Sequence, residues 1–164
     1  MISEKGEGFL IDLDHAVGEG SSDILRRTGT MEFMAIEILR GSVSHTWRHD
    51  LESFFYVLIW ILIKFQADGT KRTDNPEVTH KWSFQSAADA KYTQMSDDRE
   101  FQKVLENFSP GFSFLKEMVR KMRDILFPAS GRGIFIGTQD EHAEIYMALI
   151  NVLEEYTLTV ETRV

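Results

Sequence analysis

The sequence predicts a mainly α-helical domain with one short β element near its N-terminus. Apolar residues recur with helical spacing in two long stretches, 51–62 and 114–126, and such spacing is typical of helices that pack against a core. Only residues 8–14 have the pattern of a buried strand. With 164 residues, 43% of them apolar, and no internal repeat or linker, we expect a single domain over residues 1–164.

The N-terminal part reads as a strand followed by a loop. Residues 8–14, Gly-Phe-Leu-Ile-Asp-Leu-Asp, predict a short strand that carries two carboxylates, Asp12 and Asp14, at its end. The glycines and serines that follow predict a loop. Residues 34–39 predict one or two helical turns that end at Gly41.

The strongest periodic signal predicts a central helix over residues 50–65. Six apolar residues fall on one helical face, at i, i+3, i+4, i+7, i+8 and i+11: Leu51, Phe54, Phe55, Leu58, Ile59 and Leu62. The opposite side is apolar too, with Val57, Trp60, Ile61 and Ile63. A helix that is apolar all round is buried among other elements, so we expect this helix at the centre of the domain.

The helical remainder, residues 83–157, follows a polar connection over residues 67–80. Apolar spacing and the turn residues between the apolar stretches predict helices over residues 83–92, 98–108, 109–128 and 140–156. Residues 131–137 form a glycine-flanked apolar stretch, which predicts either a loop or a short strand.

Composition narrows the classes of function. The net charge of −8 and the sequence pI of about 5.1 argue against a nucleic-acid partner, because phosphate binding needs clustered Lys and Arg. There is no cysteine, which excludes disulfides, thiolate zinc sites and cysteine nucleophiles and suits a reducing compartment. The longest apolar run, Phe54–Ile63, is shorter than the roughly 20 residues of a membrane span. We expect a soluble intracellular protein, and the sequence leaves its compartment open.

The two carboxylates of the N-terminal strand are the first candidate site. Mg²⁺ prefers oxygen ligands, usually one or two carboxylates together with phosphate groups, which Asp12 and Asp14 would suit. The same tripeptide is equally typical of an ordinary polar strand end. His45 and His49 have i, i+4 spacing, but no glutamate follows His45 as a zinc-protease helix requires, so packing or hydrogen bonding is predicted for them.

Three motifs in order resemble the fungal-type protein kinase family. Residues 29–37, Gly-Thr-Met-Glu-Phe-Met-Ala-Ile-Glu, resemble the end of a kinase activation segment. Residues 48–55, Arg-His-Asp-Leu-Glu-Ser-Phe-Phe, resemble the start of the helix that follows it, and Asp12-Leu13-Asp14 stands in the place of Asp-Phe-Gly. The resemblance covers residues 8–66 and implies the helical C-terminal lobe (C-lobe) of a protein kinase-like fold, with residues 15–37 as its activation segment.

The resemblance implies a role for each matching residue. Asp12 would hold Mg²⁺ against the phosphates of ATP, and Thr30 would lie in the loop that docks the protein substrate. Asp50 would brace the catalytic loop; as a plain alternative, it caps the helix that it begins. For the complete domain the family implies ATP, Mg²⁺ and protein Ser/Thr substrates.

Glu37 would be the buried acid that anchors the activation segment to the lobe. In the family this acid pairs with an arginine, for which Arg123 and Arg132 are the candidates here. The loop ahead of it carries a candidate phospho-switch beside two arginines, although solvated loop residues give the same pattern. The residues of this candidate switch are Ser21, Ser22, Thr28 and Thr30.

The chain departs from the kinase pattern in ways that bear on activity. Ile36 stands where most kinases have proline, and Asp14 replaces a glycine. No glycine-rich loop, strand lysine or His-Arg-Asp loop precedes Asp12, so no residue of the chain is expected to accept the substrate proton or clamp the nucleotide. We therefore expect no phosphoryl transfer and no bound cofactor for this chain alone, and a partner that supplies the missing N-terminal lobe (N-lobe). Whether the chain is a true product or a truncated gene model stays open.

Two other classes of function fit parts of the sequence. Residues 9–14 also resemble the first motif of haloacid-dehalogenase-like phosphatases, with Asp12 as nucleophile and Asp14 as acid/base. That family continues with Gly-Thr, where this chain has His15-Ala16, and it needs a parallel sheet. The non-enzymatic alternative is a helical binding module, a pseudokinase-like fragment that presents the face left open by the missing lobe.

Overall fold

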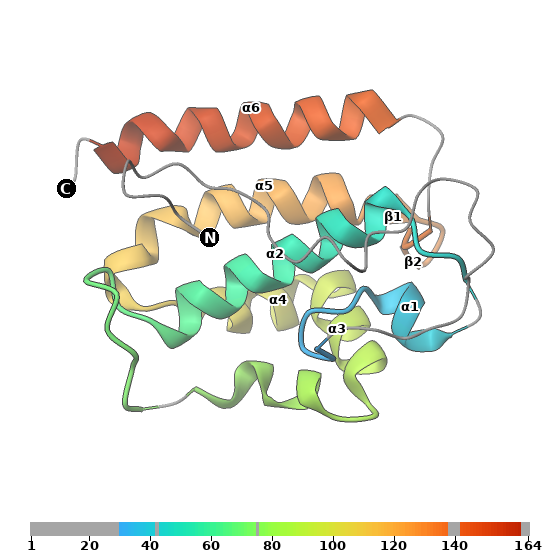
Figure 1. Cartoon of the computed structure of the whole chain (residues 1–164), viewed down its shortest axis with the longest axis horizontal. Coiled ribbons are helices and arrows are strands. Elements are labelled where there is room, and N and C mark those ends of the chain that lie inside the picture. The colour runs from blue at the N-terminus through green and yellow to red at the C-terminus, as the bar shows by residue number, and fades with distance from the viewer. Residues whose placement is uncertain (1–29, 42, 75, 138–141, 162–164) are drawn as a thin grey trace, which may run out of the picture.

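The computed structural model describes residues 30–41, 43–74, 76–137 and 142–161. This part is mainly helical, which confirms the predicted class (Figure 1). In chain order the elements are α1 (Ile36–Arg40), α2 (Trp47–Lys64), η2 (Glu77–Ser83), α3 (Ala87–Ser96), α4 (Asp98–Glu106), η3 (Pro110–Leu115), α5 (Lys116–Leu126), β1 (Ala129–Ser130), β2 (Gly133–Ile134) and α6 (His142–Glu161), where η denotes a 3-10 helix. The strand predicted over 8–14 lies outside the described residues.

Helix α2 runs through the middle of the molecule (Figure 1). In that view α5 and α6 lie on one side of it, and α1, α3 and η2 lie on the other. Its core face is fully buried, with Phe55, Tyr56, Ile59 and Ile63 all 0% exposed. The prediction of burial all round is wrong for two residues, because Phe54 and Ile61 are 54% and 40% exposed.

The first turn of α2 begins earlier than the sequence predicted. The helix starts at Trp47 rather than Asp50, and Thr46 is its N-cap. Thr46 and His49 form a capping box in which His49 takes the place that glutamate or glutamine usually holds. That substitution removes the usual sequence signal, since histidine is not a typical third residue of a capping box.

One hydrophobic core joins all six α-helices and η2. Trp82 of η2 lies in it and is 0% exposed, and its ring contacts the ring of Tyr56 with centroids 5.1 Å apart. The predicted polar connection 67–80 therefore ends early, because residues 77–80 already belong to η2. The turn composition of that stretch concealed the start of a short 3-10 helix, which its own Trp82 fixes in the core.

Several boundaries in the C-terminal part differ from the sequence prediction. The helix predicted over 109–128 is divided into η3 and α5, and the helix predicted over 83–92 is α3. Residues 131–137 contain the short strand β2, which pairs antiparallel with β1 through Ala129–Ile134 and Ser130–Gly133. Within the described part of the chain, none of the helices combines the length and apolar character that crossing a membrane requires.

Candidate functional site beneath residues 30–37

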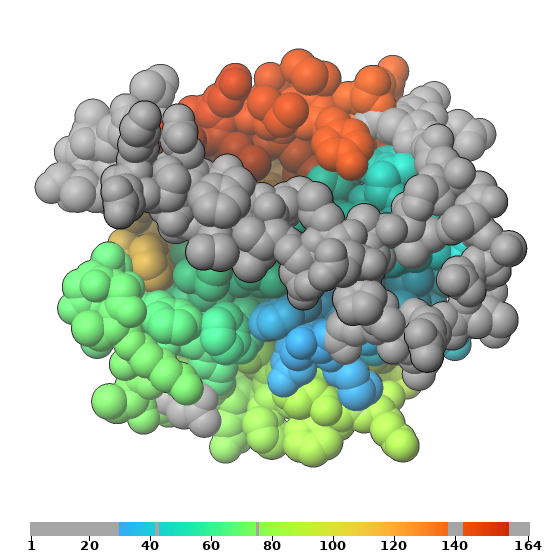
Figure 2. All heavy atoms as spheres, viewed as in Figure 1, coloured from blue at the N-terminus to red at the C-terminus, as the bar shows by residue number. Residues whose placement is uncertain are grey.

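Residues 30–37, here called the 30–37 segment, lie at the surface beside α3 (Figure 2). The segment begins with a tight turn, in which the Phe33 amide donates to the Thr30 carbonyl at 2.9 Å. Thr30 is exposed, whereas Ala35 and Ile36 are 1% and 0% exposed. The segment therefore passes from solvent into the core within a few residues, and its buried end rests on a network of charged side chains.

Glu52 of α2 is the first member of this network and is 0% exposed. Its Oε1 accepts from the Ile36 amide and from the Tyr56 hydroxyl, each at 2.8 Å, and its Oε2 accepts from Nη1 of Arg48 at 2.6 Å. Arg48 is 2% exposed, and its Nη2 donates to the Leu126 carbonyl at 2.6 Å. A buried ion pair is tolerated when further hydrogen bonds satisfy it, and this pair has three.

Lys91 of α3 is the second member and is also 0% exposed. Its Nζ donates to the carbonyls of Met34 at 2.7 Å and Met31 at 3.1 Å. The ammonium lies 4.0 Å from the centroid of the Tyr56 ring, a cation–π contact. Burial lowers the pKa of Lys91 to about 7, and the charges of Glu52 and Glu32 partly oppose this.

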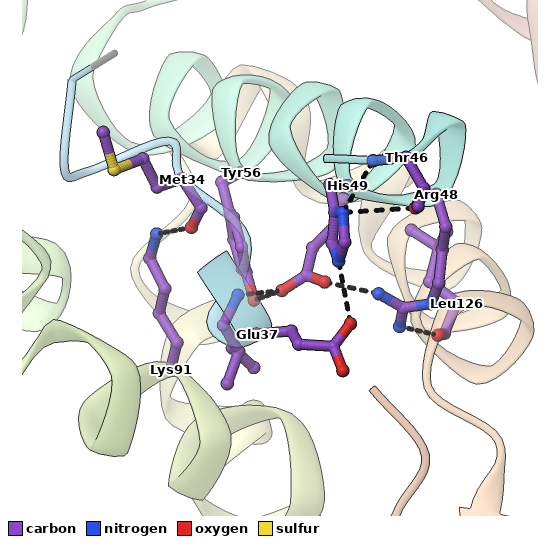
Figure 3. Close-up of polar contacts among 10 residues, drawn as sticks. Met34, Glu37, Thr46, Arg48, His49, Tyr56, Lys91 and Leu126 are labelled. Atoms are coloured by element: carbon purple, nitrogen blue, oxygen red, sulfur yellow. Dashed lines mark hydrogen bonds and ion pairs between the residues drawn. The ribbon is translucent and has the colours of Figure 1, made fainter. Parts of the chain in front are cut away.

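Glu37 and His49 form the third contact (Figure 3). Nδ1 of His49 accepts from the Thr46 amide at 3.0 Å, so the ring proton lies on Nε2, which donates to Oε2 of Glu37 at 2.9 Å. Burial lowers the pKa of His49 below its ordinary value of 6.5 despite the Glu37 charge. The imidazole is therefore neutral at pH 7, in agreement with this tautomer.

The expected arginine partner of Glu37 is therefore wrong. His49 takes that place, and the two candidate arginines are elsewhere: Arg123 donates to Asp98 at 2.7 Å, and Arg132 is exposed. A neutral histidine that is already fixed by the helix cap donates one hydrogen bond to the acid and adds no second charge.

Asp50 does not cap α2, because Thr46 holds that position. Its side chain is 60% exposed and accepts from Nε2 of His45 at 3.1 Å, a bond that raises the pKa of His45. The bracing role of Asp50 stays a prediction. So does the metal role of Asp12, which, like Asp14 and the candidate phospho-switch residues before Thr30, lies outside the described residues.

The network can hold backbone in place but has no catalytic constellation. Its charged side chains bond to main-chain groups, to one another and to the hydroxyl of Tyr56. That hydroxyl is fully buried, and burial together with the Glu52 charge raises its pKa, which disfavours its ionisation to a nucleophile. Across the residues that the structure describes, no three acidic or histidine side chains gather where they could bind a metal ion. The hydrogen bonds from Glu52 and Lys91 hold the backbone of the 30–37 segment.

Residues 1–62 match the fungal protein kinase family. The match confirms the resemblance found in the sequence, and it ends inside α2. It thus includes the 30–37 segment with His49 and Glu52, whereas Lys91 and Leu126 lie beyond it. Neither the search of curated proteins nor the search of solved structures found a match.

Three residues of this network were not predicted from the sequence: Arg48, Glu52 and Lys91. Two of them had a signal. Arg48, Glu52 and Tyr56 recur at i, i+4 and i+8, on the face where Phe55 and Ile59 are buried, and charges on a core face are normally paired. Lys91 had no such signal, because it lies in a short polar helix with no apolar stripe.

Proposed function

We propose that this chain is the C-lobe part of a fungal-type protein kinase and that the 30–37 segment docks its protein substrate. The observation that carries the proposal is the family match over residues 1–62. That stretch contains the candidate metal ligand Asp12, the 30–37 segment and the first part of α2, in the order and spacing of the kinase motifs.

The geometry of the 30–37 segment supports a docking role. Its backbone is held from α2 by Glu52 and from α3 by Lys91, while Glu37 bonds to His49. A surface that must present a substrate hydroxyl to a reacting phosphate needs a fixed backbone, because misplacement by about 1 Å can cost about a hundredfold in rate. Thr30 lies at the exposed beginning of the segment, where a substrate can meet it.

In the complete domain, Asp12 would hold the Mg²⁺ that neutralises the phosphates of ATP, and Asp50 would brace the catalytic loop. Both roles rest on the family match and the motif positions. The strand lysine and the His-Arg-Asp loop of the family are proposed to come from a separate N-lobe, and we expect phosphoryl transfer only when that lobe is present.

The proposal is tested by complementation. The polypeptide is assayed with radiolabelled ATP, Mg²⁺ and a general protein substrate, alone and mixed with the upstream half of another fungal protein kinase that carries the lysine and the His-Arg-Asp loop. We expect phosphate transfer only in the mixture, and its loss with Asp12→Asn. Asp68→Asn, in an exposed turn, is the matched control. Transfer by the polypeptide alone, or transfer unaffected by Asp12→Asn, contradicts the proposal.

One observation supports the binding-module alternative and a site for the complementing lobe. Six of the seven exposed large hydrophobic residues in the described part lie on α2 and α6. These six are Phe54, Ile61, Tyr146, Met147, Ile150 and Leu153. The two helices meet where the rings of Trp47 and Tyr146 lie with their centroids 5.5 Å apart. Large exposed apolar surface is typical of interaction sites. In the complementation assay, we expect the pair Phe54→Ser and Ile61→Ser to weaken association, whereas Phe84→Ser, on an exposed residue just after η2, leaves it unchanged.

The phosphatase alternative finds less support. A haloacid-dehalogenase-like domain needs a parallel sheet covered by helices. The strands in the described part of the chain form one antiparallel hairpin of two residues each. The same assay separates the two classes, because a phosphatase would release phosphate from a phosphomonoester without a complementing lobe.

A further inference from the structure

Lys91 has an unusual environment for a lysine. It is 0% exposed, and among the ion pairs of the described residues none involves it. Its acceptors are two neutral carbonyls, and the Tyr56 and Trp82 rings lie 4.0 and 5.4 Å from its Nζ. Lysine is almost never fully buried unless it is paired, so this arrangement calls for a reason.

Both acceptors of Lys91 belong to the 30–37 segment. Met31 and Met34 lie far from Lys91 in the sequence, so the amine joins α3 directly to the turn at the start of the segment. On the other side, the Glu52 carboxylate takes the Ile36 amide. The amine of Lys91 thus holds two carbonyls and the carboxylate of Glu52 holds an amide of the same short stretch, and together they define the path of its backbone.

Packing alone does not require an amine at this position. An apolar side chain of similar length would fill the same space between Tyr56 and Trp82, and replacing buried charges by apolar groups is often neutral or stabilising. What an apolar side chain cannot do is donate to Met31 and Met34. Burying the amine therefore costs free energy without stabilising the fold, and what it provides is a specific backbone conformation of residues 31–34.

We propose that Lys91 is the positioning residue of the 30–37 segment: its amine sets the backbone conformation of residues 31–34, and the helices fold without it. That this conformation serves substrate docking rests on the proposed function. The positioning role itself does not, because it concerns only contacts within this chain.

The first test compares the wild type with Lys91→Met, which keeps the apolar stem of the side chain and removes the amine. Amide hydrogen exchange is followed by mass spectrometry, and the methyl signals of Met31 and Met34 are followed by NMR. In Lys91→Met we expect the amides of residues 31–37 to exchange at least about ten times faster than in the wild type, because the rate at which a segment opens depends on its local hydrogen bonds. We also expect the methyl signals of Met31 and Met34 to shift or broaden. The melting temperature is expected to stay at the wild-type level or rise, and the exchange in α2 and α5 is expected to stay at the wild-type level or become slower.

The second test restores the amine chemically. The chain has no cysteine, so Lys91→Cys is the single thiol and is alkylated in the unfolded state before refolding. Aminoethylation rebuilds a lysine-like side chain, whereas propylation gives a neutral side chain of the same length. We expect the aminoethyl protein to recover wild-type exchange and Met31 and Met34 signals, and the propyl protein to behave like Lys91→Met.

Three results would overturn the proposal. One is an unchanged 30–37 segment in Lys91→Met. Another is loss of folding, or a uniform rise in exchange over all helices, in Lys91→Met and the propyl protein. The third is recovery by the propyl protein as complete as that by the aminoethyl protein. None of these readouts involves nucleotide, substrate or a second lobe, so failure of the proposed kinase function would leave them unaffected.

Discussion

At the scale of single residues, the buried acid, histidine and lysine of the site are each accommodated in a different way. Glu52 is compensated by Arg48 and by two neutral donors. His49 is neutral, because burial lowers its pKa. Lys91 has only neutral acceptors, and burial lowers its pKa to about 7. Each solution removes or compensates a charge that would otherwise be costly in the core.

Glu52→Gln should be strongly destabilising. The amide keeps the shape of the side chain but leaves Arg48 as a buried charge without its counter-ion. We expect a loss of about 3–5 kcal/mol in the free energy of unfolding, measured by urea denaturation at pH 7. Glu77→Gln, at an exposed position in η2, is the control and should change stability little. An effect of Glu52→Gln as small as that of the control would contradict the importance of this pair.

The burial of Lys91 should make stability depend on pH. Its folded pKa of about 7 lies below the ordinary value of 10.5, so between these pH values the unfolded state binds more protons. The contribution of Lys91 to the free energy of unfolding therefore becomes more favourable as the pH rises through this window, by at most about 1.4 kcal/mol per pH unit. Below pH 7 the full cost of the buried charge is present.

The measurement is the difference in unfolding free energy between the wild type and Lys91→Met at pH 7, 8 and 9. We expect this difference to shift in favour of the wild type as the pH rises. His49 does not contribute to the trend, because its folded pKa lies below 6.5 and it is neutral throughout the window. A difference that is constant from pH 7 to 9 would show that Lys91 keeps an ordinary pKa.

At the scale of elements, the hairpin of β1 and β2 depends on a close approach to α3. A Cβ added at Gly133 would lie 2.2 Å from the hydroxyl oxygen of Tyr92. The Tyr92 ring also contacts Arg40, whose guanidinium carbon lies 4.6 Å from the ring centroid. Gly133 therefore permits the hairpin to pack against a tyrosine that also contacts the end of α1.

Gly133→Ala should separate the hairpin from α3 and lower the melting temperature. We expect a loss of about 1–3 kcal/mol, the usual range for overpacking. The double variant with Tyr92→Phe removes the clashing oxygen and leaves the nearest ring carbon at 3.4 Å, so it should recover most of the loss. Equal melting temperatures for the single and double variants would mean that the clash does not set the cost.

At the scale of the whole molecule, a single core joins residues from α1 to α6. No described helix has a core of its own, and α2 contributes the largest set of its fully buried side chains. Such an arrangement favours cooperative unfolding, since loss of one element exposes the apolar surface of the others.

Leu105→Ala tests this cooperativity. Leu105 of α4 is 0% exposed, so we expect a loss of about 2–5 kcal/mol. The unfolding midpoints measured by far-UV circular dichroism and by tryptophan fluorescence should fall by the same amount. This holds although the substitution is in α4, whereas Trp82 and the other tryptophans lie on η2 and α2. Leu153, on α6, is 42% exposed, so Leu153→Ala should change neither unfolding midpoint strongly. Separate transitions for the two probes would indicate independent units.

The sequence by itself determined the helical class, the long helix at the centre and the kinase-like motif of the 30–37 segment. These follow from local information: the spacing of apolar residues along 51–62, and a string of adjacent residues that resembles a family. The anchoring role of Glu37 stays a prediction, and its contact with His49 was not predicted.

Only the tertiary structure decided that Glu37 bonds to His49, that Glu52 and Lys91 are buried, and that Phe54 and Ile61 face solvent. Each of these depends on which distant residues face a position. Lys91 meets the Met34 carbonyl across a separation of 57 residues. The free energy of an ionisable side chain is set by its neighbours in space, and the same lysine on the same short helix would be an ordinary solvated residue if nothing packed against it.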